Sequence, residues 1–64
     1  MIILKQDIKQ ENKRIGYITL KTDKAGYIIE LNLIGIRIPC QIIKTNNYNY
    51  ALHIIKTLET KYSY

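Results

Sequence analysis

The chain has 64 residues, and its 10 Lys and Arg against 5 Asp and Glu give a formal net charge of +5. A single domain of this size buries only about 60% of its unfolded-chain surface, which leaves little room for an enclosed active site. No apolar run approaches the roughly 20 residues that span a bilayer. The N-terminal residues have no signal-peptide pattern, and the single Cys cannot form an internal disulfide. We therefore expect one soluble, cytoplasmic domain covering residues 1–64, with no membrane contact.

The composition carries two further indications. Ile, Lys, Asn and Tyr are abundant and Val is absent, which indicates an AT-rich gene of the kind common in phages, plasmids and low-GC bacteria. The net positive charge suits a polyanionic partner. The alternative is that the charge only keeps a small protein in solution.

The first segment, residues 2–9, alternates between apolar and charged positions, which is typical of a half-buried strand. One face of this strand holds Ile2, Leu4, Gln6 and Ile8. The other face holds Lys5, Asp7 and Lys9. The polar residues 10–13 predict a turn that leads into the second strand.

The second segment, residues 14–22, is rich in strand-forming residues. Its predicted core face holds Ile18 and Leu20. Its other face holds Ile15, Tyr17, Thr19 and Lys21. Residues 23–26 end in Gly26, which can adopt the positive φ of a hairpin turn.

Two more strands are expected before residue 46. In the segment 27–33, the two faces hold Tyr27, Ile29, Leu31 and Leu33 on one side and Ile28, Glu30 and Asn32 on the other. Gly35 marks a turn or bulge. In the segment 36–45, the predicted core face holds Ile36, Ile38, Cys40 and Ile42, and the other face holds Arg37 and Gln41. Because Pro39 cannot donate a ladder hydrogen bond, this strand belongs at an edge or is bulged there.

The last segment changes to a helical period. Its apolar stripe consists of Tyr48, Ala51, Leu52, Ile55, Leu58 and Tyr62. Asn46 or Asn47 can cap the N-terminus of the helix, and Lys61 suits the dipole at its C-terminus. We expect this helix to cover one face of the sheet and to leave the other face open.

These elements predict an α+β fold. It consists of a small antiparallel β-sheet of three to four strands, connected as a meander, with one C-terminal amphipathic helix packed on one face. The predicted core is Ile2, Leu4, Ile18, Leu20, Ile29, Leu31, Ile38, Cys40, Ile42, Ala51, Leu52, Ile55 and Leu58.

The chain offers little for catalysis. Its acidic residues are scattered, and its three glycines do not form a phosphate-binding loop. One thiol, Cys40, and one imidazole, His53, are too few for a tetrahedral metal site. A nucleophile pair would require Cys40 to leave the core and to reach His53. We expect no enzymatic activity, no metal and no cofactor.

The open sheet face is the better candidate for function. It is predicted to present Lys5, Lys9, Tyr17, Lys21, Arg37 and Gln41. Such side chains contact phosphates and base edges, and Tyr17 can stack on an unpaired base. We therefore expect binding to DNA or RNA. The simpler alternative is an ordinary solvated face, and Glu30 in its middle argues against a uniform phosphate platform.

A protein partner is the second interpretation. Six Tyr are the only aromatic residues, and Tyr48, Tyr50, Tyr62 and Tyr64 flank the two ends of the helix. Tyr is favoured in protein interfaces, although some of these rings can simply close the core. The chain would then be a small inhibitor of a host or defence enzyme, of the kind that phages and mobile elements carry. An exposed edge strand would also allow a homodimer.

Two families share part of this pattern. Tyr27, Gly35, Ile43-Lys44-Thr45 and Ala51 occur in an order that resembles the N-terminal arm-binding domain of phage-type integrases, over residues 27–59. The resemblance implies a three-stranded sheet with a packed C-terminal helix, and a sheet face that reads the major groove with Arg37 and Gln41 as contacts. The gap between Thr45 and Ala51 is longer here, and the strands carry fewer basic residues.

The second resemblance covers a Gly-Tyr strand and a capped helix start. The run Gly26-Tyr27-Ile28-Ile29-Glu30 with Gly35, followed by residues 47–52, is similar to HicB-like antitoxin domains. The Pro that precedes the turn in that family is missing here, and the gap from Gly35 to the helix is longer.

Overall fold

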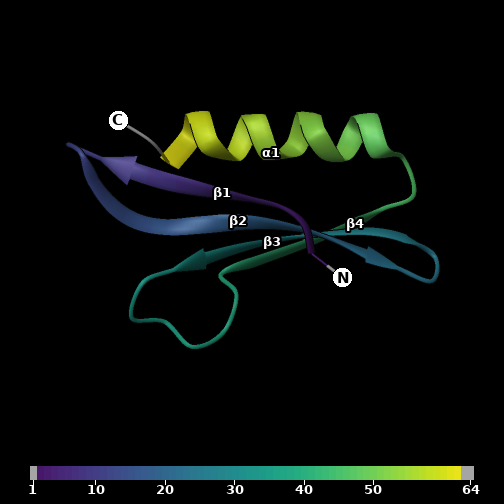
Figure 1. The fold of residues 1–64 in the computed structure, drawn as a ribbon, viewed down its shortest axis with the longest axis horizontal. Coiled ribbons are helices and arrows are strands. Elements are labelled where there is room, and N and C mark those ends of the chain that lie inside the picture. The colour runs from purple at the N-terminus through teal and green to yellow at the C-terminus, as the bar shows by residue number, and fades with distance from the viewer. Residues whose placement is uncertain (1, 63–64) are drawn as a thin grey trace.

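The computed structural model describes residues 2–62 and contains a four-stranded sheet with one helix lying across it (Figure 1). The elements are β1 (Ile2–Gln10), β2 (Lys13–Asp23), β3 (Gly26–Leu33), β4 (Gln41–Thr45) and α1 (Tyr48–Tyr62). The strands follow one another in the sheet in chain order, and each neighbouring pair is antiparallel. This is the predicted α+β meander with its C-terminal helix. Tyr64, expected beside the end of the helix, lies outside the described residues.

Two tight turns join the first three strands, as the sequence predicts. Gln10 pairs with Lys13 across the first turn, where Glu11 and Asn12 both have positive φ, 51° and 65°. Asp23 pairs with Gly26 across the second turn, and Gly26 has a φ of 150°. The Asp23 carboxylate accepts a hydrogen bond of 2.6 Å from the backbone N–H of Lys24, which holds this second turn.

The core lies between α1 and the sheet. Its buried members are Ile8, Ile18, Leu20, Ile29, Leu31, Ala51, Ile54, Ile55 and Leu58. Of the predicted core, Ile18, Leu20, Ile29, Leu31, Ala51, Ile55 and Leu58 are confirmed. Tyr27 and Ile43 pack against the edge of this cluster.

Two bulges change the face assignment in β1 and β2. Ile15 is an extra residue in β2, because Ile8 pairs with Gly16 and the next residue of β1 pairs with Arg14. Ile15 therefore packs against the core and not on the open face as predicted. Ile3 is likewise an extra residue in β1, and it places Ile2 opposite Lys21, whereas Leu4 stays opposite the core residue Leu20. The prediction that Ile2 and Leu4 are buried is wrong, because both are exposed.

The fourth strand is shorter than predicted. Residues 34–40 form a loop, and β4 begins only at Gln41. The predicted core residues Ile38 and Cys40 are exposed in this loop, Ile38 by 72%. Ile42 is also wrongly placed: it is 53% exposed, because Ile43 is the residue of β4 that packs against the core.

Helix α1 begins with an Asn cap. The side-chain oxygen of Asn47 accepts a 3.0 Å hydrogen bond from the backbone N–H of Tyr50, so Asn47 is the capping residue among the two candidates. The buried stripe is rotated slightly from the prediction, since Ile54 is buried and Leu52 is exposed. Within residues 2–62, no helix has the length and apolarity that crossing a membrane requires.

Candidate functional site

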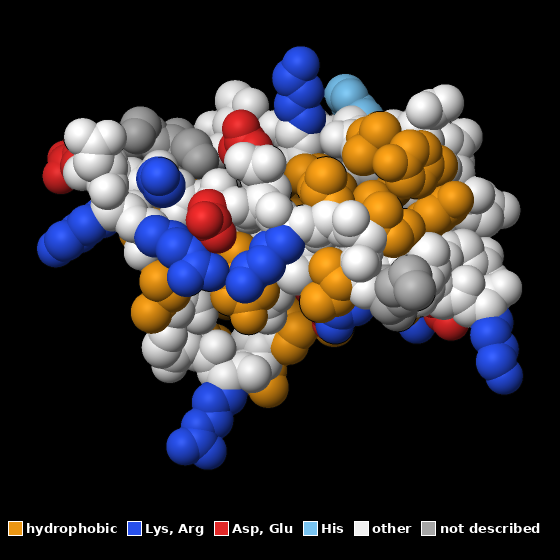
Figure 2. All heavy atoms as spheres, in the orientation of Figure 1, with side chains coloured by type: hydrophobic (Ala, Val, Ile, Leu, Met, Phe, Trp, Pro, Cys, Tyr) orange, Lys and Arg blue, Asp and Glu red, His pale blue; other side chains and the backbone are white. Residues whose placement is uncertain are grey.

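Helix α1 covers one face of the sheet, and we call the opposite face the open face (Figure 1). Successive side chains of a strand point to opposite faces, so the neighbours of the buried strand residues lie on the open face. Basic side chains project from several sides of the molecule (Figure 2). We therefore use the strand alternation to decide which of them lie on the open face. The charged members of the open face are Lys5, Asp7, Lys9, Arg14, Lys21, Asp23, Glu30 and Lys44.

Tyr17 is the centre of a small cationic cluster on this face. The Lys5 Nζ lies 4.5 Å from the centroid of the Tyr17 ring, and the Arg14 Cζ lies 5.3 Å from it. The Arg14 Nε also donates to the Asp7 carboxylate at 3.0 Å. Cation–π contacts of this kind favour defined positions for long basic side chains. A base that stacked on a ring face occupied by one of these cations would have to displace it.

In the middle of the open face, the short side chain of Thr19 is covered by its longer neighbours. Thr19 pairs with Lys5 on one side and with Glu30 on the other. It is only 3% exposed, and its Oγ1 has no hydrogen-bond partner among the described residues. Glu30 forms an ion pair with Lys21. The centre of this face is thus nearly neutral, and its positive charge lies toward the outer strands.

The structure brings together four of the six predicted site residues. Lys5, Lys9, Tyr17 and Lys21 share the open face as expected. The predicted strand position of Arg37 is wrong, because this residue lies in the loop between β3 and β4. The predicted face of Gln41 is also wrong: it pairs with the core residue Leu31, on the side of α1.

Two basic residues of the open face were missed by the sequence analysis. Arg14 reaches it because the bulge at Ile15 shifts the alternation of β2 by one residue. Lys44 reaches it because β4 turns Ile43 toward the core. A regular period of two would have placed Arg14 on the core face, so only the register of the hairpin identifies it.

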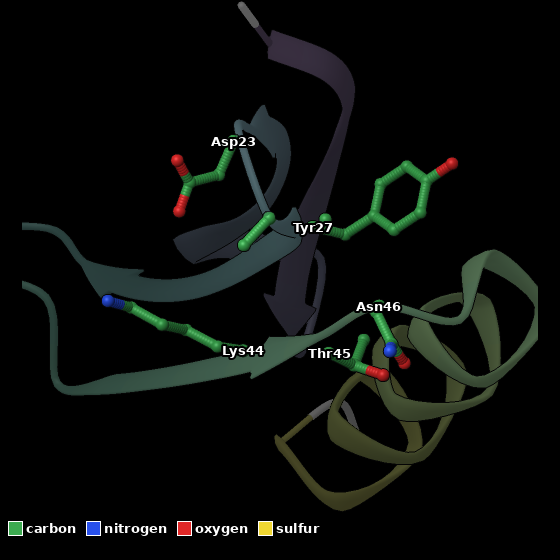
Figure 3. Close-up of a pocket in the computed structure, with 7 residues that line it drawn as sticks. Asp23, Tyr27, Lys44, Thr45 and Asn46 are labelled. Atoms are coloured by element: carbon green, nitrogen blue, oxygen red, sulfur yellow. The ribbon is translucent and has the colours of Figure 1, made fainter.

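A shallow hollow of about 220 Å³ lies where the turn between β2 and β3 meets the end of β4 (Figure 3). Asp23 and Lys44 point away from α1 here, whereas Thr45 and Asn46 lie beside the helix. The Asp23 carboxylate already accepts the bond that holds its own turn. The edge of the open face at this hollow therefore holds one carboxylate, Asp23, and one cation, Lys44.

Cys40 and His53 are both exposed, so the predicted burial of Cys40 is wrong. Among residues 2–62, no three side chains of His, Cys, Asp or Glu gather closely enough to hold a metal ion.

Comparison with known protein families, with curated proteins and with solved structures finds no match to this chain.

Proposed function

We propose that this chain is a small, non-catalytic module that binds nucleic acid through its open face. The observation that carries the proposal is the charge of that face. Its cations are Lys5, Lys9, Arg14, Lys21 and Lys44, and its carboxylates are Asp7, Asp23 and Glu30. A surplus of Lys and Arg on one sheet face is the electrostatic footprint expected of a phosphate-binding surface.

The cations on the two outer strands of the sheet are placed to contact the two phosphate backbones of a nucleic-acid duplex. Strands lie about 4.8 Å apart, so β1, which carries Lys5 and Lys9, and β4, which carries Lys44, are roughly 14 Å apart across the sheet. Along the strands, Lys44 is level with Ile2, and Lys9 lies toward the opposite end of β1. The major groove of duplex DNA is about 12 Å wide. The two edges of the sheet can therefore rest on the phosphates on either side of a groove, with the nearly neutral centre between them.

The carboxylates of the open face do not prevent this contact. Arg14–Asp7 is a half-exposed pair, with 41% and 48% of the two side chains exposed. Exposed ion pairs contribute only about 0–1 kcal/mol, so a phosphate can compete for the guanidinium. Lys5, Lys9 and Lys44 form no ion pair with a carboxylate among the described residues.

Binding of labelled duplex and single-stranded oligonucleotides at increasing salt tests this proposal. If Lys5, Lys9 and Lys44 each neutralise one phosphate, the logarithm of the association constant for duplex DNA falls with the logarithm of the salt concentration with a slope of about −3. Failure to bind either oligonucleotide at low salt would overturn the proposal.

A further inference from the structure

A groove of about 330 Å³ runs between β4 and α1, on the side of the sheet away from the proposed nucleic-acid face. Its apolar floor is formed by Ile43, Ile54 and Leu58. Its polar rim includes Gln41, Thr57 and Lys61. No carboxylate is among the described residues that line it. The groove therefore combines an apolar floor with a polar rim that carries one cation, Lys61.

The groove lies beside an unpaired strand edge. β4 pairs with β3 on one side only, because it is the last strand of the sheet. The outer backbone N–H and C=O groups of such a strand are free to pair with another extended chain. A peptide that added to β4 would place every second side chain over the groove floor.

The opposite edge of the sheet is less suited to this mode of binding. In β1, the bulge at Ile3 interrupts the regular register near the start of the strand, and bulges of this kind hinder strand addition. At the other end of β1, the Gln10 side chain donates a 2.8 Å hydrogen bond to the backbone carbonyl of Tyr62, which ties the strand to α1. β4 is therefore the edge that combines free backbone with a groove.

We propose that β4 and this groove bind an extended peptide in which apolar and acidic residues alternate. The apolar side chains would cover Ile43, Ile54 and Leu58, which fits the floor of the groove. The alternate side chains would lie beside Ile42 and Lys44 on the other face of the added strand. The charge of Lys44 favours acidic residues at these alternate positions, whereas a second copy of this chain carries the same net charge of +5 and is repelled.

Fluorescence anisotropy with a labelled eight-residue peptide of alternating Leu and Glu tests the proposal. The matched protein variants are Thr57→Trp, which fills the groove, and Thr60→Trp, which changes an exposed residue of the same helix outside the groove. We expect Thr57→Trp to weaken peptide binding at least about tenfold, and Thr60→Trp to leave it unchanged. Equal effects of the two variants would overturn the proposal.

Two control peptides test the chemistry of the occupant. A peptide with Lys in place of Glu should bind far more weakly, because these alternate side chains lie beside Lys44. A Leu–Glu peptide with N-methyl groups on alternate amides should lose binding in at least one of its two registers, because strand pairing needs those N–H groups. Retained binding by both N-methylated registers, or self-association of the protein through β4 without peptide binding, would contradict the inference. Lys5→Ala and Lys9→Ala should not alter peptide binding, which separates this test from that of the nucleic-acid face.

Discussion

Gly16 allows β2 and β3 to approach at a position where no side chain fits. A Cβ at Gly16 would lie 2.2 Å from the backbone carbonyl oxygen of Asn32, which cannot move without disturbing the sheet. We expect Gly16→Ala to lower the free energy of unfolding by about 2–3 kcal/mol. Gly35→Ala is the matched control, since its Cβ would meet nothing within 4 Å and only the positive φ of 89° is strained; it should cost about 1 kcal/mol. Urea unfolding that ranks the two variants in the reverse order would contradict this reading.

Thr19 buries a hydroxyl for which no partner is found within residues 2–62. Replacing such a group by an apolar one of the same shape removes a desolvation penalty, so Thr19→Val should raise the free energy of unfolding by about 1 kcal/mol. Thr45→Val is the control, because the Thr45 hydroxyl accepts a 3.2 Å hydrogen bond from the backbone N–H of Asn47. That variant should lower stability by about 0.5–1 kcal/mol. A loss of stability in Thr19→Val would show that the hydroxyl has a partner in solution.

Tyr17 contacts the cations of the open face with its ring and not with its hydroxyl. Its contacts to Lys5 and Arg14 are made by the ring face, and each such contact is worth about 0.5–1 kcal/mol at an exposed site. We expect Tyr17→Leu to weaken oligonucleotide binding about fivefold, by loosening the two cations. Tyr17→Phe keeps the ring and should bind like the unmodified protein. Equal weakening by both variants would assign the contact to the hydroxyl.

At the scale of elements, the hairpin of β1 and β2 is held by a turn with two left-handed residues. Glu11 is poorly suited to a φ of 51°, and Asn12 tolerates its φ of 65° better. Glu11→Asn combined with Asn12→Gly creates the favoured dipeptide for this turn, and we expect a gain of about 1 kcal/mol in thermal or urea unfolding. Lys24→Asn combined with Ala25→Gly is the control, since neither residue has a positive φ. A similar gain from both pairs would show that the turn geometry is not the cause.

The elements that the sequence predicts best are β3 and α1. β3 pairs with β2 residue by residue without a bulge, so its alternation places Ile29 and Leu31 correctly in the core. α1 has both a strong apolar period and a capping Asn47. Of its predicted stripe, Tyr48 and Leu52 are exposed, and Ile54, which lies outside that stripe, is buried. The local sequence pattern is enough to assign the buried positions where a strand pairs without a bulge or a helix has a regular apolar period.

The remaining elements depart from the prediction for two physical reasons. A bulge inserts one residue without a sequence signal, and it exchanges the faces of all residues beyond it; this is how Arg14 reaches the open face and Ile15 reaches the core. The apolar alternation before β4 continues through a loop that buries none of Ile34, Ile36 and Ile38. As a result, alternation alone predicts three of the five cations of the open face, Lys5, Lys9 and Lys21, and it misplaces Arg37 and Gln41.

At the scale of the whole molecule, the dimensions suit a short stretch of duplex. The backbone extends over 36 × 23 × 16 Å, and one turn of B-DNA is about 34–36 Å long. A molecule lying with its long axis along the duplex would therefore cover about ten base pairs. The net charge of +5 also draws the chain to any polyanion, so binding alone does not locate the contact.

The most direct measurement compares two double variants of equal charge on a labelled duplex of about twelve base pairs. Lys5→Ala with Lys9→Ala removes two cations from the open face, and Lys56→Ala with Lys61→Ala removes two from α1. We predict that the first pair weakens binding strongly and reduces the salt slope by about 2, while the second pair leaves both close to those of the unmodified protein. Equal weakening by the two pairs would contradict the assignment of nucleic-acid binding to the open face.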